Sequence, residues 1–340
     1  MNQAVPEIGS NSQGSASRLL EVYAPIVEAL ESVNELLKKQ IALSGPLLAD
    51  RLAKSGLSSG KRVRPALLLL CGAAAGDLKK THVAAAAAVE LVHAATLVHD
   101  DVLDNADERR HEPSLNAVWD NTTSILTGDF LFSKAFEVAS TSGSMDVVRR
   151  IAGSSCKVCE GEICQNASIG NFEVTEEEYF NIIGLKTAEL CACSCGLGAL
   201  LSECDGDMVS AFESYGNNLG VAFQIVDDVL DLVGQTKQVG KTLGTDLVNQ
   251  KTTLPLIHCL STLGREDASR RADLLAQLSN SKPDHAVIVA ALNETESIAY
   301  ARNIARQHAE EASRFVESLS ASRFRDSLRQ LAEFVISRTH

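Results

Sequence analysis

Apolar residues recur at intervals of three and four along most of the chain, which is the period of a helix with one buried face. The period is clear between Leu19 and Leu37, and it returns in an alanine-rich run from Ala84 to about Leu103. Alternating strand-like stretches and Asn-Gly or Asp-Gly hairpin signals are scarce. The same period predicts further helices over residues 115–140, 145–168, 207–233, 252–264, 284–294, 296–319 and 322–337.

Polar segments indicate where these helices begin and end. Thr175, which three glutamates follow, is a good capping residue for a helix that continues past Leu200. Residues 204–207 fit a turn between two helices, and residues 234–250 form a long polar loop of a kind that is often functional. Because no linker or fixed-period repeat divides the chain, we predict an all-α fold with a single large helical domain over residues 17–340.

The composition is that of an ordinary globular protein, with 45% hydrophobic and 22% charged residues among 340. Residues 1–16 are rich in Ser, Gly, Asn and Gln, and we expect a disordered tail there. This start lacks the basic and apolar regions of a secretory signal, and no apolar run reaches the ~18–20 residues that span a bilayer. We therefore expect a cytoplasmic protein without a transmembrane segment.

Charge and cysteine content narrow the function classes. With 31 basic and 44 acidic residues the net charge is −13, which argues against nucleic acid as a partner because phosphate backbones attract a basic surface. The nine cysteines are an odd number, as expected for reduced thiols. Cys156 and Cys159, and the alternating Cys191, Cys193 and Cys195, lie in apolar helical sequence, so we predict buried structural thiols and no zinc site.

Two acid clusters carry the candidate chemistry. Each reads Asp-Asp-x-x-Asp, and each ends an apolar helix. Residues four apart share a helix face with Cβ atoms roughly 5–6 Å apart, and stacking like charges there costs stability, so cation binding explains the clusters better than solvation does. Magnesium takes a few carboxylates and completes its shell with water and phosphate oxygens. We predict a site for several Mg²⁺ ions at Asp100, Asp101, Asp104, Asp227, Asp228 and Asp231.

Positive residues lie beside both clusters. They are the cations of the segment 60–65, Arg109, Arg110, Lys186, Lys241 and Lys251. Arginine suits bidentate phosphate contacts, and lysine acts as a point charge. In an acidic chain, this joint placement predicts that phosphate groups are captured between the cations and the metal-binding acids.

Together these segments resemble the trans-(E)-polyprenyl diphosphate synthase family, most of all its long-chain, octaprenyl-type members. The matching motifs are GKRVRP (60–65), LVHAATLVHDDVLDNADERR (91–110), GDFLFSKAF (128–136), KTAEL (186–190), FQIVDDVLDL (223–232) and GKTLGTDLVNQKTTLPLIH (240–258). The resemblance implies an all-α fold around a deep central cavity and a homodimer. It also implies a Mg²⁺-dependent prenyltransferase that condenses isopentenyl diphosphate with an allylic diphosphate.

The resemblance also assigns roles to single residues. Asp100, Asp104 and Asp227 would hold the Mg²⁺ ions, and the other three aspartates would support them. The implied catalytic residues are Lys186, Thr187 and Gln224, the last two as oxygen dipoles beside the allylic cation. The residues implied for the allylic diphosphate are Arg109, Lys186, Lys241 and Lys251. Those implied for isopentenyl diphosphate are Lys61, Arg64, His93 and Arg110.

Positions upstream of the first acid cluster set product length in this family. A short-chain enzyme typically has an aromatic ring near the fifth position before the first aspartate, where this chain has Ala95. One helical turn advances roughly 5.4 Å, comparable to one isoprene unit, so we expect a long product of roughly six to ten units. The expected chain-length residues are Val92, Ala95 and Thr96 on the wall, with Phe132 and Phe136 as the floor.

Two departures from the family pattern bear on affinity and loop geometry. Residues 111–114 read His-Glu-Pro-Ser where Gly-Lys-Pro-Thr is frequent, and Gln250 stands where a glycine is common. The alternatives are a short-chain (farnesyl or geranylgeranyl) synthase, a class I terpene cyclase, a non-catalytic regulatory subunit and an HD-type phosphohydrolase. Two complete acid clusters disfavour the last three. We also expect a peripheral membrane contact for product release.

Overall fold

The structure is a computed structural model that describes residues 12–55, 60–109, 112–233, 244–280 and 282–337. Helices make up nearly all of this part of the chain, which confirms the predicted all-α fold. The elements are α1 (Ser12–Tyr23), the 3₁₀ turn η1 (Ala24–Ile26), α2 (Val27–Ala42), α3 (Pro46–Lys54), α4 (Val63–Ala75), α5 (Lys80–Leu103), β1 (Glu108–Arg109), β2 (Glu112–Pro113), α6 (Leu115–Val118), α7 (Asn121–Ser140), α8 (Met145–Ala167), α9 (Glu176–Ile183), the π-helical turn η2 (Gly184–Ala188), α10 (Glu189–Leu201), α11 (Gly206–Val233), α13 (Thr245–Val248), α14 (Leu254–Glu266), α15 (Ala268–Leu278), α16 (His285–Glu294), α17 (Ser297–Ser318) and α18 (Arg323–Ser337).

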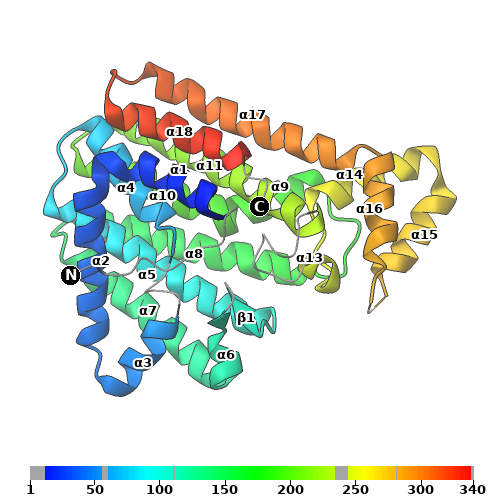
Figure 1. Ribbon diagram of the computed structural model, residues 1–340, viewed down its shortest axis with the longest axis horizontal. Helices are drawn as coiled ribbons and strands as arrows, with labels where there is room; N and C mark the ends of the chain where they lie inside the picture. Colours follow the sequence, from blue (N-terminus) through cyan, green and yellow to red (C-terminus); the bar gives the residue numbers. More distant parts are fainter. Residues whose placement is uncertain (1–11, 56–59, 110–111, 234–243, 281, 338–340) are drawn as a thin grey trace.

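The long helices form a layered bundle with α11 near its middle (Figure 1). Helix α5 packs most extensively against α7, while α10 packs against both α4 and α11. Helices α17 and α18 lie side by side along one edge, and α15 and α16 form the opposite end from α2. Because α11 has neighbours on several sides, its acid cluster lies within the bundle instead of on an outer face.

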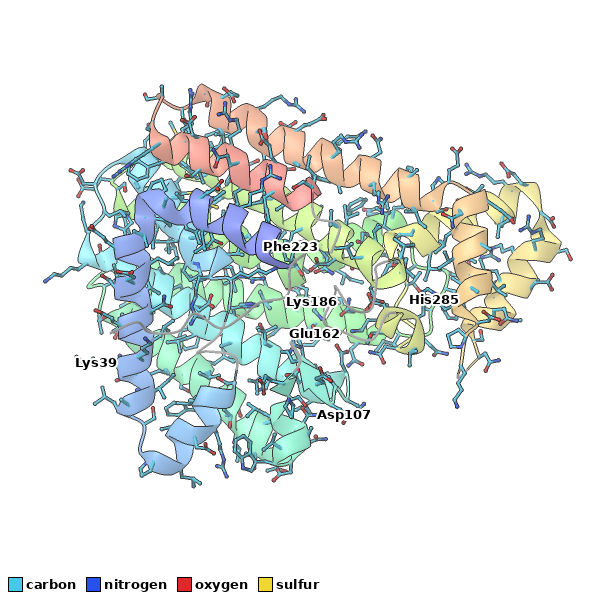
Figure 2. The ribbon with its side chains drawn as sticks, in the orientation of Figure 1. Lys39, Asp107, Glu162, Lys186, Phe223 and His285 are labelled. Carbon is cyan, nitrogen blue, oxygen red and sulfur yellow. The ribbon has the colours of Figure 1, made fainter. Side chains whose placement is uncertain are left out.

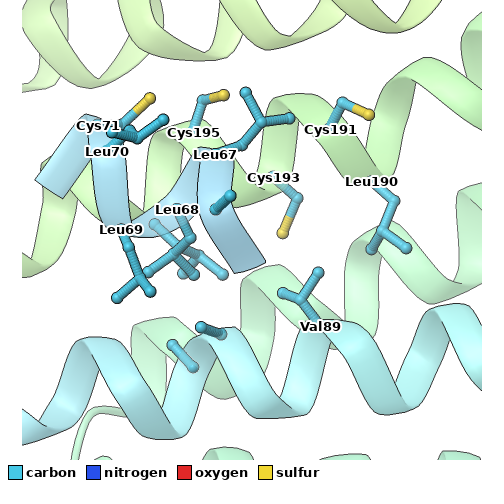
Figure 3. Close-up of a cluster of buried hydrophobic side chains, with 14 of the residues drawn as sticks. Leu67, Leu68, Leu69, Leu70, Cys71, Val89, Leu190, Cys191, Cys193 and Cys195 are labelled. Atoms are coloured by element: carbon cyan, nitrogen blue, oxygen red, sulfur yellow. The ribbon is translucent and has the colours of Figure 1, made fainter. Parts of the chain in front are cut away.

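Apolar side chains of α4, α5 and α10 interlock in the main core (Figure 3). The run Leu67–Leu70 is completely buried there, beside the thiols of Cys191, Cys193 and Cys195. These three cysteines are therefore buried structural thiols, as predicted. For Cys156 and Cys159 the prediction was wrong, since both side chains are exposed on the outward face of α8.

The structure confirms the predicted helix start at Thr175 and differs from the predicted boundaries at two other places. Thr175 caps α9 in a reciprocal pair with Glu178, whose carboxylate accepts from the Thr175 backbone N–H at 2.8 Å. The helix expected over 115–140 is two helices, because the Asp120 side chain caps α7 by accepting from the Thr123 N–H at 2.7 Å. Helix α1 begins at Ser12, before the expected end of the polar tail, and residues 1–11 lie outside the described ranges.

Within the described ranges, two helices are long and apolar enough to span a membrane, judged by length and composition alone. These are Lys80–Leu103 and Glu176–Leu201, with mean hydropathies of 1.4 and 1.3. Of the apolar window in each, 72% and 67% of the residues are buried inside the fold, which is typical of core helices.

Candidate active site

The first acid cluster closes the C-terminal end of α5. The Asp104 N–H donates to the Asp100 carbonyl at 2.8 Å, so the helical spacing is kept and the two side chains share a face. Asp101 points to the other side and is 5% exposed. Its carboxylate accepts from Arg109 Nε at 2.6 Å. The cluster is thus divided into an outer pair, Asp100 and Asp104, and an inward residue that binds a cation of the protein itself.

A short hairpin brings Arg109 to this position. Arg109 on β1 pairs across the strands with Glu112 on β2. The residues that flank the two strands are joined by Ser114, whose hydroxyl donates to the Ala106 carbonyl at 2.6 Å. Predicted ligand Arg110 and the departure His111 lie outside the described residues. The structure therefore places Arg109 at the first cluster as expected, but with Asp101 as its partner.

The second acid cluster lies in the last turns of α11. Asp228 is 4% exposed and accepts two hydrogen bonds, from Tyr179 Oη at 2.6 Å and from Gln224 Nε2 at 2.7 Å. Burial raises the pKa of Asp228 well above its usual range, and the nearby Asp246 adds to that rise. Asp231 anchors the returning chain, since its carboxylate accepts from the Asp246 N–H at 3.0 Å. Asp227 is half-buried on the same helix.

The π-helical turn η2 carries Lys186 and Thr187 between α8 and α11. A side chain at Gly161 of α8 would meet the Lys186 backbone nitrogen at 2.5 Å, and one at Gly220 of α11 would meet Ala188 at 2.6 Å. These two glycines let both helices approach the turn closely. A π-turn inside a helix is frequent at functional sites because the extra residue re-aims the side chains around it.

Each side chain of this turn contacts a different wall of the site. Lys186 Nζ forms an ion pair with Glu162 and donates to Gln165 Oε1 at 2.7 Å, both on α8. Figure 2 shows Lys186 and Glu162 next to each other in the middle of the molecule. Thr187 Oγ1 donates to Gln224 Oε1 on α11 at 2.8 Å. The turn therefore joins α8 to the helix of the second acid cluster.

Lys251, in the segment that follows the second cluster, reaches the first cluster. Its ammonium donates to Asp104 Oδ1 at 2.7 Å, although 147 positions separate the two residues in the chain. Burial opposes the charge on Lys251, but Asp104, Asp246 and Glu162 together raise its pKa above the ordinary value. The segment that follows the second cluster thus reaches the carboxylates of the first. Predicted ligand Lys241 lies outside the described residues.

Gln250, which stands where the family commonly has glycine, directly precedes this lysine and has a backbone conformation that favours glycine. Gln250 has φ = 53°, in the left-handed region that favours glycine. The Gln250 carbonyl accepts from the Gly170 N–H at 3.0 Å, which ties the turn to the end of α8. A left-handed non-glycine residue costs roughly 1–2 kcal/mol, so this chain holds Lys251 in place with a mildly strained turn.

The residues implied for isopentenyl diphosphate lie on the α4–α5 pair. Lys61 precedes α4, and Arg64 in its first turn has a buried Nε that forms no hydrogen bond within the described ranges. His93 is half-buried on α5, two turns before Asp100. Their neighbour Arg62 has a structural role, because it is buried, has φ = 50° and donates to Glu90 at 2.6 Å. That ion pair fixes the backbone between Lys61 and Arg64.

The expected chain-length residues lie where α5 packs against α7. Val92 and Ala95 are completely buried, and the Thr96 hydroxyl donates to the His93 carbonyl at 2.8 Å. Phe132 and Phe136 are half-buried on α7. Two cavities of about 340 and 520 Å³ adjoin α11, and the six clustered aspartates line neither. The central cavity implied by the resemblance therefore stays a prediction.

Four polar residues of the site were missed by the sequence reasoning. They are Glu162, Gln165, Tyr179 and Asp246. A signal existed for Tyr179, which lies seven positions and hence two turns before Lys186. The other three carry none on their own, because single polar residues in a helix or loop are usually solvated.

The outer acid pair fits a hard divalent cation. Burial raises the pKa of Asp100 to about 6, with Lys186 opposing the shift and Glu162 adding to it. In the part of the chain that the structure describes, the Asp100 carboxylate accepts no hydrogen bond, so a cation would satisfy a buried charge there. No three His, Cys, Asp or Glu side chains of the described ranges converge on one point. A bound Mg²⁺ would thus need oxygens from water and phosphate, as Mg²⁺ commonly does.

Comparisons with known proteins agree on one family. The family model described as polyprenyl synthetase matches residues 47–295. Octaprenyl diphosphate synthase of Escherichia coli (strain K12) is 32% identical over 324 residues, covering 95% of this chain and 97% of the relative. Short chain isoprenyl diphosphate synthase of Methanothermobacter thermautotrophicus is also 32% identical, over 330 residues, covering 95% and 100%.

Solved structures agree with the sequence relatives. Decaprenyl diphosphate synthase from Rhodobacter capsulatus superimposes with a TM-score of 0.86 at 32% identity, covering 96% of this chain and 99% of that one. Polyprenyl synthase from Caulobacter crescentus CB15, complexed with calcium and isoprenyl diphosphate, superimposes with a TM-score of 0.87 at 30% identity, covering 99% and 100%. Both matches span the whole helical bundle.

Proposed function

The chain belongs to the polyprenyl synthetase family and is a prenyltransferase, and from this premise we propose that it condenses isopentenyl diphosphate with an allylic diphosphate in a Mg²⁺-dependent reaction. The observation that carries the proposal is that cations from separate segments gather at the first acid cluster, beside the helix of the second. Lys251, after the second cluster, binds Asp104 of the first at 2.7 Å. Lys186, whose charge acts on Asp100, lies one residue from Thr187, which binds Gln224 of the second cluster's helix.

The residues would divide the work as follows. Asp100 and Asp104 on one side, and Asp227 with Asp231 on the other, would hold Mg²⁺ together with the allylic diphosphate. Bound Mg²⁺ would supply positive charge to the departing diphosphate. Lysine and arginine side chains fixed around the leaving group add to that stabilisation without reorganising during the reaction. These cations are Arg109, Lys186, Lys241 and Lys251.

The carbon chemistry needs dipoles in a dry environment. Thr187 and Gln224 would present oxygen atoms to the allylic carbons as positive charge develops there. Both lie against the buried apolar layer of α10 and α11, which excludes water that would otherwise trap the cation. Lys61, Arg64, His93 and Arg110 would hold isopentenyl diphosphate, and the departed diphosphate is the proposed acceptor of the final proton.

We propose a long product, of about six to ten isoprene units. The support is Ala95, which is completely buried five positions before Asp100 and leaves no ring in that place. Relatives described as octaprenyl and decaprenyl synthases agree with this, whereas the short chain relative is equally similar, so the residues themselves must decide. Incubation with isopentenyl and farnesyl diphosphates, with and without EDTA, followed by chromatography, tests reaction, metal requirement and length together. A product of three or four units, or EDTA-resistant turnover, would contradict the proposal.

Substitution at Ala95 tests the wall directly. Ala95→Tyr is expected to shorten the product by several units, because its ring would fill the space upstream of the first cluster. Ala222 is a matched control, since it is also completely buried and lies five positions before Asp227. Ala222→Tyr should lower stability by overpacking, by about 1–3 kcal/mol, without shortening the product. If Ala95→Tyr still makes the long product, the wall assignment is wrong.

We propose a homodimer built on the exposed faces of α7 and α8. Ile125 and Leu126 of α7 are 44% and 62% exposed, and Met145 and Ile163 of α8 are 62% and 69% exposed. Apolar side chains exposed together on adjacent helices commonly mark protein–protein contacts. Sedimentation should give close to twice 36.3 kDa, and Leu126→Asp with Ile163→Asp should give the monomer mass. A cytoplasmic location and a peripheral membrane contact for product release also remain our predictions.

A further inference from the structure

A chain of hydrogen bonds runs from α9 through α11 to the π-helical turn. Tyr179 Oη donates to Asp228 Oδ2, and Gln224 Nε2 donates to Asp228 Oδ1, at 2.6 and 2.7 Å. Thr187 Oγ1 then donates to Gln224 Oε1 at 2.8 Å. Tyr179 and Asp228 are each 4% exposed, so water has little access to the bond between them. Buried polar groups linked in this way hold one another in a single arrangement.

The direction of the bonds decides which way the Gln224 amide faces. Asp228 Oδ1 accepts from the NH₂ group of Gln224, so the oxygen of the same amide is left to accept from Thr187. Thr187 has one hydroxyl proton and uses it on Gln224. The lone pairs of the Thr187 oxygen are then left for a developing positive charge beside it.

Tyr179 fixes the orientation of the Asp228 carboxylate. It occupies one carboxylate oxygen, and Gln224 occupies the other. Without the tyrosine hydroxyl, the Asp228 carboxylate would be held on one side only, so it could rotate and draw the Gln224 amide with it. Gln224 would then move away from the Thr187 hydroxyl, and the two oxygen dipoles would no longer be held together beside the allylic carbons.

We infer that Tyr179 is a positioning residue, which acts through Asp228 to orient Gln224 and Thr187 toward the allylic cation. The same geometry makes Asp228 a support for these dipoles, since each of its oxygens already accepts from a protein donor. The inference rests on the proposed function, because it concerns the cation formed in that reaction. It adds a residue that lies outside all the recognised motifs of the chain.

Tyr179→Phe tests the inference with a control of the same kind. The variant is expected to lower kcat at least about tenfold with KM for isopentenyl diphosphate unchanged, because a misplaced catalytic group can cost about 10²-fold. Tyr215 is the matched control: it is 1% exposed, and its hydroxyl donates to the Leu328 carbonyl at 2.9 Å, away from Thr187 and Gln224. Tyr215→Phe should lose a similar buried bond but keep kcat. Equal kcat values for the two variants would overturn the inference.

Two further tests ask whether Tyr179 acts through Gln224 and whether Asp228 binds the metal. Gln224→Leu should already be slow, and adding Tyr179→Phe should slow it no further, whereas multiplying effects would contradict action through Gln224. Asp228→Asn should lower kcat without changing the Mg²⁺ concentration for half-maximal activity. A several-fold rise in that concentration would identify Asp228 as a metal ligand and overturn its assignment as a support.

A structural measurement keeps the inference testable apart from turnover. A crystal structure of Tyr179→Phe should show Gln224 displaced from Thr187, beyond hydrogen-bond distance. An undisturbed Thr187–Gln224 pair would overturn the inference whether or not the enzyme makes a long product. Absence of product in the wild-type assay would instead refute the proposed function and leave this structural result to decide the inference.

Discussion

In both acid clusters the second aspartate turns into the protein, but its partners differ. Asp101 accepts from the guanidinium of Arg109, and Asp228 accepts from two uncharged donors, Tyr179 and Gln224. The first cluster therefore pairs its inward aspartate with a cation. The second gives its inward aspartate two uncharged donors, and burial together with the nearby Asp246 raises the pKa of Asp228. Identical sequence motifs thus have different electrostatics, because the surrounding helices supply different partners.

The first aspartate of each cluster, Asp100 or Asp227, should have a similar effect on turnover. Asp100→Ala and Asp227→Ala should each lower turnover by about 10²- to 10³-fold or more, since both remove an oxygen ligand that stabilises the leaving diphosphate. Steady-state kinetics with saturating Mg²⁺ measures this, and circular dichroism should show unchanged helix content. Near-normal activity in either variant would mean that only one cluster binds the metal.

Removing a partner of the inward aspartate should lower the free energy of unfolding more in the first cluster than in the second. Arg109→Ala removes the guanidinium that pairs with the buried Asp101 carboxylate, and we expect a loss of about 2–3 kcal/mol, below the full buried-pair value because Arg109 is 21% exposed. Tyr179→Phe removes one of two neutral donors and should cost about 1–2 kcal/mol. Urea unfolding in EDTA measures both, with Arg109→Lys as an intermediate control. Equal losses would show that the charge of the partner is unimportant.

His82, at the N-terminal end of α5, should have a smaller effect on stability, and this effect should depend on pH. It must be known before any pH dependence is assigned to the acid clusters. His82 is completely buried, accepts from the Lys79 N–H at 3.0 Å, and places Nε2 3.1 Å from Ser202 Oγ. Burial lowers the pKa of His82 below 6.5, with the backbone hydrogen bond to Gly198 partly opposing the shift. The unfolded chain therefore binds more protons below about pH 6.5, and stability should fall there by up to about 1.4 kcal/mol per pH unit.

The measurement is urea unfolding in EDTA across this pH range. His82→Gln should show a flatter dependence of the unfolding free energy on pH than the wild type. If the slope is unchanged, the acid sensitivity comes from the aspartates instead.

Much of the helical fold could be predicted because periodicity and capping are local properties. Thr175 and Glu178 stand three positions apart and form their reciprocal cap from sequence alone. The break at Asp120 and the π-turn at Lys186 could not be predicted in this way. The Asp120 cap is also local, but helical spacing continues on both sides of it and conceals the break. The π-turn depends on how closely α8 and α11 approach.

The sequence by itself determined the chemistry available to this protein: two acid clusters, the cations beside them and a small residue at position 95. These features follow from residue type and helical spacing, which do not depend on tertiary contacts. Only the tertiary structure decided that Asp101 and Asp228 face inward, that Lys251 meets Asp104, and that Tyr179 joins the site. Each of these contacts joins separate structural elements, so it depends on how those elements pack as well as on spacing along the chain.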